Sequence, residues 1–132
     1  MPDAAKPDEA GQAYTFGAHD SRPWGEWLVI DAGAGFAVKR ITVLPGQRLS
    51  LQRHRHRAEQ WVVVAGTALV TCGDAVLTLT AGESVRIAQG ETHRVENRGT
   101  ETVVFIEVQT GSVLSEDDIE RLHDDYGRVA AP

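Results

Sequence analysis

Two groups of metal-capable side chains are the chemically most informative part of this chain. The first contains Gln52, His54, His56 and Glu59, and the second contains His93. Imidazole nitrogens and carboxylate oxygens are donors that bind Mn, Fe, Co, Ni or Zn. Polar groups gathered on one inward face need partners, because burying them unpaired is costly. A divalent metal is one such partner, and a hydrogen-bonded polar core or a surface histidine cluster are the alternatives.

The residues around the first group alternate between two kinds of side chain. Successive side chains of a strand point to opposite faces, so we expect a ligand face backed by a cationic face. The ligand face carries Gln52, His54 and His56, and the cationic face carries Arg53, Arg55 and Arg57. Together with Arg48, these arginines could form a positive pocket for a small anion. A solvated charged face is the alternative.

The composition limits the classes of function. A chain of 132 residues suits one domain, and its net charge of −6 argues against binding to nucleic acid or to an anionic membrane. Cys72 is the only cysteine, which excludes an internal disulfide. The first residues have neither a basic start nor an apolar run, and no stretch of about 18 apolar residues occurs. We therefore expect a cytoplasmic protein.

Short segments rich in β-branched, aliphatic and aromatic residues follow one another between glycine-containing turns. Segments of this kind at intervals of about eight to twelve residues are typical of an all-β sandwich or barrel. The expected strands are Trp24–Asp31, Phe36–Leu44, Leu49–His54, Gln60–Ala65, Ala68–Cys72, Ala75–Leu79, Glu83–Ile87, His93–Glu96 and Thr102–Gln109.

The two ends of the chain differ from this pattern. Residues 1–20 are rich in Pro, Asp, Ala and Gly and are interpreted as a flexible arm, which leaves residues 21–132 as a single domain. Near the other end, Ser115 and Asp118 have the spacing of a capping box, and Gly127 could end the helix that begins there. We expect one short C-terminal helix whose acidic side chains are solvated.

The two groups also resemble the paired motifs of the cupin superfamily. The first motif reads from Gly46 through the ligand positions to Gly66, and the second reads from Gly82 to Asn97. More narrowly, the chain resembles the cupin domain of type II mannose-6-phosphate isomerases, which is commonly the C-terminal part of bifunctional enzymes with mannose-1-phosphate guanylyltransferase activity. The resemblance spans about residues 22–128. The shared strings include Arg22-Pro-Trp-Gly25, Leu49-Ser-Leu-Gln52, His56-Arg-Ala-Glu59, Trp61-Val-Val-Val64 and Ile106-Glu-Val-Gln109.

The resemblance implies a fold and a metal site. The fold would be a cupin double-stranded β-helix, a jelly-roll barrel. One divalent ion, Zn, Mn, Co or Ni, would be held by Gln52, His54, Glu59 and His93. A glutamine in the first ligand position resembles phosphomannose isomerases, whereas many cupin dioxygenases have a histidine there, so Gln52 favours the isomerase.

The resemblance also implies a reaction, the interconversion of mannose 6-phosphate and fructose 6-phosphate through an enediol, in carbohydrate metabolism and polysaccharide biosynthesis. His56 and Glu107 are the candidates for proton transfer, although Glu107 could instead pair with Lys39 or Arg40. Arg57 is a further candidate catalytic residue. A phosphate group needs cationic partners, and the candidates are Arg57, Arg48, Lys39 and Arg94. A sugar-binding cupin without catalysis and another metal enzyme, such as a dioxygenase, are the alternative functions.

Three positions depart from the family pattern, namely Arg55, Gln60 and Ala88, and none of them is a predicted ligand. We expect no guanylyltransferase activity, because the 132 residues contain no glycine-rich nucleotide-binding region. The expected partners are a small sugar phosphate and a second copy of the chain in a homodimer. Trp24, Trp27 and Leu28 could cover the sheet edge of that copy or could close the protein's own core.

Overall fold

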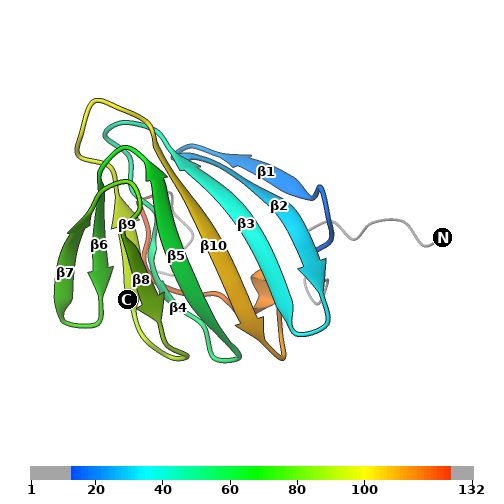
Figure 1. Ribbon diagram of the computed structural model, residues 1–132. Coiled ribbons are helices and arrows are strands. Elements are labelled where there is room, and N and C mark those ends of the chain that lie inside the picture. The colour runs from blue at the N-terminus through cyan, green and yellow to red at the C-terminus, as the bar shows by residue number, and fades with distance from the viewer. Residues whose placement is uncertain (1–12, 126–132) are drawn as a thin grey trace.

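Two antiparallel β-sheets make up the described part of the chain, residues 13–125 of the computed structural model (Figure 1). The six-stranded sheet has the order β1 (His19–Arg22), β2 (Gly25–Gly33), β3 (Phe36–Val43), β10 (Val103–Gly111), β5 (Arg57–Ala65) and β8 (Ser84–Ile87). The five-stranded sheet has the order β11 (Glu120–His123), β4 (Leu51–Arg53), β9 (His93–Glu96), β6 (Ala68–Cys72) and β7 (Ala75–Leu79).

The hydrophobic core lies between the sheets and takes residues from both. Val63 and Phe105 come from the larger sheet, Val70 and Val95 from the smaller one, and each is almost completely buried. Because side chains alternate along a strand, these residues occupy the inward positions of their strands. Burial of this apolar surface is the main term that stabilises the fold.

The inward face of the larger sheet changes character part-way along its central strands. On β10 the buried residues pass from Phe105 to Glu107 and Gln109, and Glu107 lies opposite Lys39 of β3 and Trp61 of β5. The apolar half of the sheet forms the core. The polar half therefore faces into the interior at the other end of the sandwich, where a ligand could be held.

The all-β fold predicted from the sequence is confirmed. Each of the nine expected strands is present, and three of them, Ala68–Cys72, Ala75–Leu79 and His93–Glu96, have the expected bounds. The largest difference is at β4, which ends at Arg53, and β5, which begins at Arg57.

The predicted C-terminal helix is wrong. Ser115 does begin a turn, because its Oγ accepts a hydrogen bond from Asp117 N at 3.3 Å, but the turn is a single 3-10 turn, η1 (Glu116–Asp118). The chain then continues as β11, which pairs with β4, and the side chains of Arg53 and Glu120 form an ion pair at 2.8 Å. Pairing with the sheet edge has overridden the local helix signal. The predicted helix end at Gly127 lies outside the described residues.

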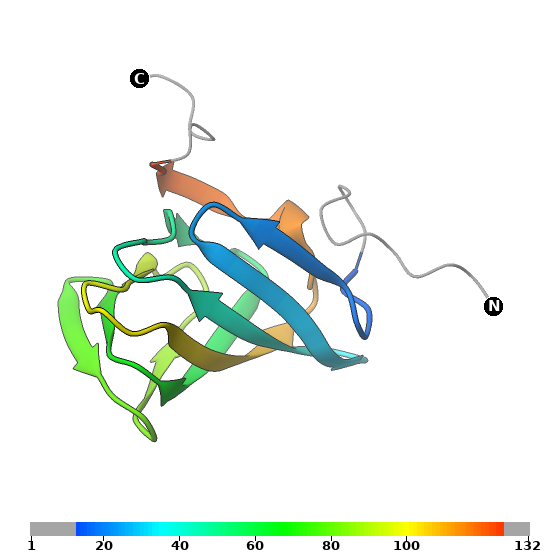
Figure 2. The same cartoon turned by 90° about the horizontal axis from the view of Figure 1, so that it is seen from above.

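The interpretation of residues 1–20 as an arm is also wrong for the part that the structure describes. Tyr14 is 4% exposed, and its backbone N donates to Leu114 O at 3.0 Å. Residues 19–22 form β1 and pair with β2. Figure 2 shows the dark blue β1 alongside β2 at the edge of the larger sheet. Residues 1–12 lie outside the described part.

The tryptophans considered for a dimer contact lie inside their own chain. Trp24 and Trp27 are each 4% exposed and belong to the core cluster. The two tryptophans therefore close the protein's own core, which is the second of the two sequence interpretations. The predicted homodimer would need another surface. In residues 13–125 no helix has the length and apolar character needed to cross a membrane.

Candidate metal centre

His54, Glu59 and His93 converge inside the sandwich. One ligand atom from each lies within 4.8 Å of the others, and all three side chains are buried. His54 Nε2 is 3.2 Å from His93 Nε2 and 3.2 Å from Glu59 Oε2, and His93 Nε2 is 3.7 Å from Glu59 Oε1. Donors that each lie about 2.0–2.2 Å from one ion stand roughly 3.0–3.5 Å apart. The three side chains therefore fit a single divalent cation.

Backbone carbonyls orient both imidazole rings. His54 Nδ1 lies 3.0 Å from Asp118 O, and His93 Nδ1 lies 3.0 Å from Glu91 O. A carbonyl can only accept, so each Nδ1 donates its proton, and in a neutral ring the Nε2 lone pair is then turned toward the centre. Burial lowers the pKa of His54 to about 4, which keeps that ring neutral at pH 7. Two facing lone pairs are what a cation between them would bind.

Glu59 is held at both oxygens. Trp61 Nε1 donates to Oε1 at 3.0 Å, and Arg57 Nε donates to Oε2 at 3.0 Å. Although burial opposes ionisation, the positive charge of Arg57 holds the pKa of Glu59 below its ordinary value. Glu59 is therefore the anionic member of the donor set.

Gln52, the fourth ligand implied by the resemblance, lies next to this group. It pairs with His93 across β4 and β9, and its side chain lines the same cavity. Its Nε2 donates to Ser50 Oγ at 2.9 Å, which fixes the orientation of the amide.

A bend between β4 and β5 corrects the prediction for His56. The predicted strand would place His54 and His56 on one face, but β4 ends at Arg53, and His56 lies in the bend with its side chain exposed, outside the cavity. The same bend turns Arg57 inward, where it is 3% exposed. The alternation rule applies to a continuous strand, and it fails here because the strand is interrupted.

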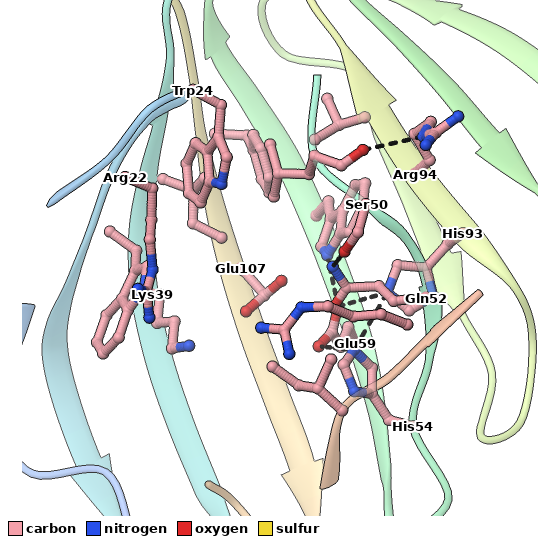
Figure 3. A pocket seen from close by; sticks show the side chains of 18 of the residues that line it. Arg22, Trp24, Lys39, Ser50, Gln52, His54, Glu59, His93, Arg94 and Glu107 are labelled. Atoms are coloured by element: carbon pink, nitrogen blue, oxygen red, sulfur yellow. Dashed lines mark hydrogen bonds and ion pairs between the residues drawn. The ribbon is translucent and has the colours of Figure 1, made fainter. Parts of the chain in front are cut away.

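His54, Glu59 and His93 lie in the wall of an open cavity of about 580 Å³, solvent at its mouth included (Figure 3). In that view Glu107 lies between Lys39 on one side and the cluster of Glu59 and His54 on the other. The charged residues that line the cavity are Arg22, Lys39, Arg57, Arg94 and Arg121, with the carboxyl groups of Glu59 and Glu107. Cations outnumber carboxyl groups in this lining, so the cavity suits an anionic ligand.

Glu107 is buried on the floor of the cavity at 4% exposure. Gln109 Nε2 donates to its Oε2 at 2.7 Å. Burial, followed by the negative charge of Glu59, raises the pKa of Glu107 to about 8. Lys39 is placed across the strand pair from Glu107, and its Nζ lies 3.8 Å from the centre of the Tyr14 ring. Glu107 therefore faces the cavity, as one of the two sequence interpretations required.

The predicted phosphate residues separate into two groups. Arg57, Lys39 and Arg94 line the cavity, and Arg94 Nε donates to Leu49 O at 2.9 Å. Arg48 is not part of the lining and instead forms an ion pair with Asp125 at 2.6 Å. The prediction for Arg48 is wrong, because proximity along the sequence to the ligand strand does not bring it into the cavity.

Several lining residues were missed by the sequence analysis. Arg121 falls within the predicted helix that is absent, and Arg22 enters the sequence prediction only as part of a shared string. The sequence of residues 119–123 does carry a strand signal. Ile119 and Arg121 lie two positions apart, as residues on one face of a strand do, and both line the cavity. Gln109 is not part of the lining but donates a hydrogen bond to Glu107; it lies two positions away, so strand alternation could have identified it as a neighbour.

The departures from the family pattern lie outside the cavity. Arg55, Gln60 and Ala88 are all exposed, and none of them lines it. Gln60 points away from Glu59, as strand alternation predicts. These three departures therefore leave the candidate ligands and the cavity wall unchanged.

Comparison with known proteins places these features in a family. Residues 10–124 match the family model described as "Mannose-6-phosphate isomerase C-terminal". The chain is 56% identical over 111 residues to the alginate biosynthesis protein AlgA of Pseudomonas aeruginosa, covering 84% of this chain and 23% of that protein. It is 56% identical over 108 residues to the mannose-1-phosphate guanylyltransferase ManC of Salmonella typhimurium, covering 82% and 22%. The chain thus spans less than a quarter of the length of these relatives.

Solved structures support the fold alone. An uncharacterised Klebsiella pneumoniae protein with a double-stranded β-helix domain superposes with a TM-score of 0.63 at 24% identity, covering 71% of this chain and 80% of that one. The two packed sheets are therefore a cupin double-stranded β-helix.

Proposed function

The chain belongs to the mannose-6-phosphate isomerase C-terminal family, and from this premise we propose that it is a metal-dependent isomerase of mannose 6-phosphate and fructose 6-phosphate. The observation that carries the proposal is the convergence of His54, Glu59 and His93 at the wall of a cavity lined mostly by cations. A sugar phosphate needs both features, since its phosphate is anionic and its reacting carbons carry oxygens that a metal can bind. The names of the relatives further suggest a role in polysaccharide biosynthesis.

Four residues would hold the divalent ion: His54, Glu59 and His93, together with Gln52. The ion would act as a Lewis acid that stabilises negative charge on the sugar oxygens as the enediol forms. The hydrogen bonds to Nδ1 of both rings and to both oxygens of Glu59 hold these donors in place before substrate arrives.

Glu107 is the proposed proton shuttle. The isomerisation moves one proton between C2 and C1, so one group must take it up and return it. Among the described residues that line the cavity, the carboxyl groups are those of Glu59 and Glu107, and Glu59 is assigned to the metal. Gln109 Nε2 donates to Glu107 Oε2 and so holds the carboxyl group that would exchange the proton.

The phosphate would bind to cationic side chains of the lining. Lys39 and Arg94 remain the proposed contacts from the sequence, and Arg22 and Arg121 are added because they line the same cavity. Arg57 is engaged with Glu59 and with Ser115 O, so we assign it to the sugar oxygens nearest the metal.

The test is a coupled assay of the metal-loaded protein with mannose 6-phosphate, in which fructose 6-phosphate is detected. His54→Ala should abolish turnover, because it removes a ligand, whereas His19→Ala changes an exposed histidine of β1 and should leave turnover unchanged. Metal-loaded protein that binds mannose 6-phosphate without turnover would refute the isomerase and support a sugar-phosphate-binding cupin.

A further inference from the structure

Residues 115–121, which we call the C-terminal clamp, touch the metal centre at several points. Asp118 O accepts the Nδ1 proton of His54 at 3.0 Å, and Ser115 O accepts a hydrogen bond from Arg57 Nη1 at 3.2 Å. Ile119 and Arg121 form part of the cavity wall. The clamp therefore contacts a ligand, the arginine beside the ligands and the cavity.

The carboxylate of Asp118 also holds the bend that separates β4 from β5. Its Oδ1 accepts from Arg55 N at 3.0 Å, and its Oδ2 accepts from His56 N at 2.9 Å. Both oxygens thus bind consecutive backbone N–H groups, and the Asp118 side chain is 8% exposed. Hydrogen bonds to an ionised acceptor are shorter and stronger than those between neutral groups.

The carbonyl groups of the bend are held from other directions. Gly90 N donates to His54 O at 2.7 Å, and Ser112 N donates to His56 O at 3.1 Å. Gly111 lies so close to His56 O that a Cβ at that position would collide with it. The backbone N–H groups of positions 55 and 56 have no strand partner in the bend. The Asp118 carboxylate therefore supplies the hydrogen-bond acceptors that the carbonyl groups of a neighbouring strand would otherwise supply.

We propose that Asp118 is a positioning residue of the metal centre, an inference that rests on the metal site of the proposed function. One residue fixes His54 in two ways, because its carbonyl sets the imidazole tautomer and its carboxylate sets the backbone directly after His54. The same bend directs Arg57 toward Glu59. Outer groups that orient metal ligands typically contribute about 10- to 100-fold to metal affinity.

The experiment compares Asp118→Asn with Asp117→Asn. Both replacements remove one carboxylate, but Asp117 is exposed and Asp118 is buried. An asparagine at position 118 can accept from one of the two N–H groups, while its own N–H₂ group opposes the other. The dissociation constant for Co²⁺ is measured by calorimetry, at a temperature below the unfolding midpoint of every variant, and the absorption bands of the bound Co²⁺ are recorded.

We expect Asp118→Asn to weaken Co²⁺ binding by about 10-fold or more and to shift the Co²⁺ bands. Asp117→Asn should stay within twofold of the parent. Amide hydrogen exchange should quicken at Arg55 and His56 in Asp118→Asn, and Asp118→Ser, which retains one acceptor, should give an intermediate affinity. A general loss of stability would not shift the absorption bands of a site that is still occupied.

Several results would overturn the inference. They are a folded Asp118→Asn protein that binds Co²⁺ within twofold of the parent, an equal loss in Asp117→Asn, and a parent protein that binds no divalent metal. The test does not measure isomerase activity. A parent that binds Co²⁺ with the expected dependence on Asp118 and yet fails to isomerise would therefore refute the proposed function and leave the role of Asp118 intact.

Discussion

The replacement Glu59→Gln should destabilise the metal-free protein strongly, besides abolishing metal binding. Arg57 and Glu59 are 3% and 2% exposed, and their ion pair is 3.0 Å long. Removing one member of a buried pair leaves the other charge uncompensated, at a cost of about 3–5 kcal/mol. Ser115 O still accepts from Arg57, and Glu107 lies nearby, so we expect the lower end, about 3 kcal/mol. For a domain of this size that corresponds to a fall of roughly 10–15 °C in the unfolding midpoint.

The assay is thermal unfolding in the presence of a chelator, so that bound metal adds nothing to the measured stability. The matched control is Glu96→Gln, whose partner Arg98 is 72% exposed, and which should cost less than about 1 kcal/mol. The double replacement Glu59→Gln with Arg57→Met removes both charges and should regain most of the lost stability without regaining metal binding. A midpoint for Glu59→Gln within about 3 °C of the parent, or a double variant as unstable as the single one, would refute the reasoning.

Three further predictions concern the metal, the cysteine and a buried asparagine. Adding Mn²⁺ or Zn²⁺ at about 100 times its dissociation constant should stabilise the parent by about 2.7 kcal/mol in thermal unfolding; an equal shift in Glu59→Gln would place the metal elsewhere. Burial, with a hydrogen bond to Glu91, raises the pKa of Cys72 to about 11. At pH 8 only about 0.1% of the thiol is therefore ionised. The reaction of Cys72 with a disulfide reagent should be slow at pH 8 and should become faster toward pH 11. Rapid labelling at pH 8 would contradict this. Asn97→Ala removes hydrogen bonds to Val43 O, Glu101 O and Gly99 N and should cost about 2–4 kcal/mol in urea unfolding, whereas Gln89→Ala, at an exposed position, should cost almost nothing.

Much of the fold could be predicted because its signal is local. A strand that is buried on one side alternates apolar and polar residues, and the glycine turns mark where strands end. The same alternation correctly assigned Gln60 to the side opposite Glu59. The grouping of His54, Glu59 and His93 followed from spacing together with the family resemblance, and the three side chains do converge.

What could not be predicted depends on contacts between distant parts of the chain. His56 was placed on the ligand face because nothing near position 55 reveals the bend, which is held by Asp118, 63 positions later. The helix expected after Ser115 failed for the same reason, since a strand edge provided by β4 outweighed a local capping signal. Arg121 reaches the cavity as part of that strand.

The last described segment of the chain, after Leu114, contributes to the candidate metal centre and to the cavity wall but not to the hydrophobic core cluster. Every member of the core cluster in the described residues, including the partly buried ones, lies at or before Leu114, whereas Asp118 and Arg121 come after it. Mutations in this last short segment can therefore alter metal affinity or the cavity wall without replacing any residue of the core cluster. A laboratory library confined to Ile119 and Arg121, which line the cavity, would therefore vary the ligand-facing wall while the core cluster and the Asp118 contacts stay unchanged.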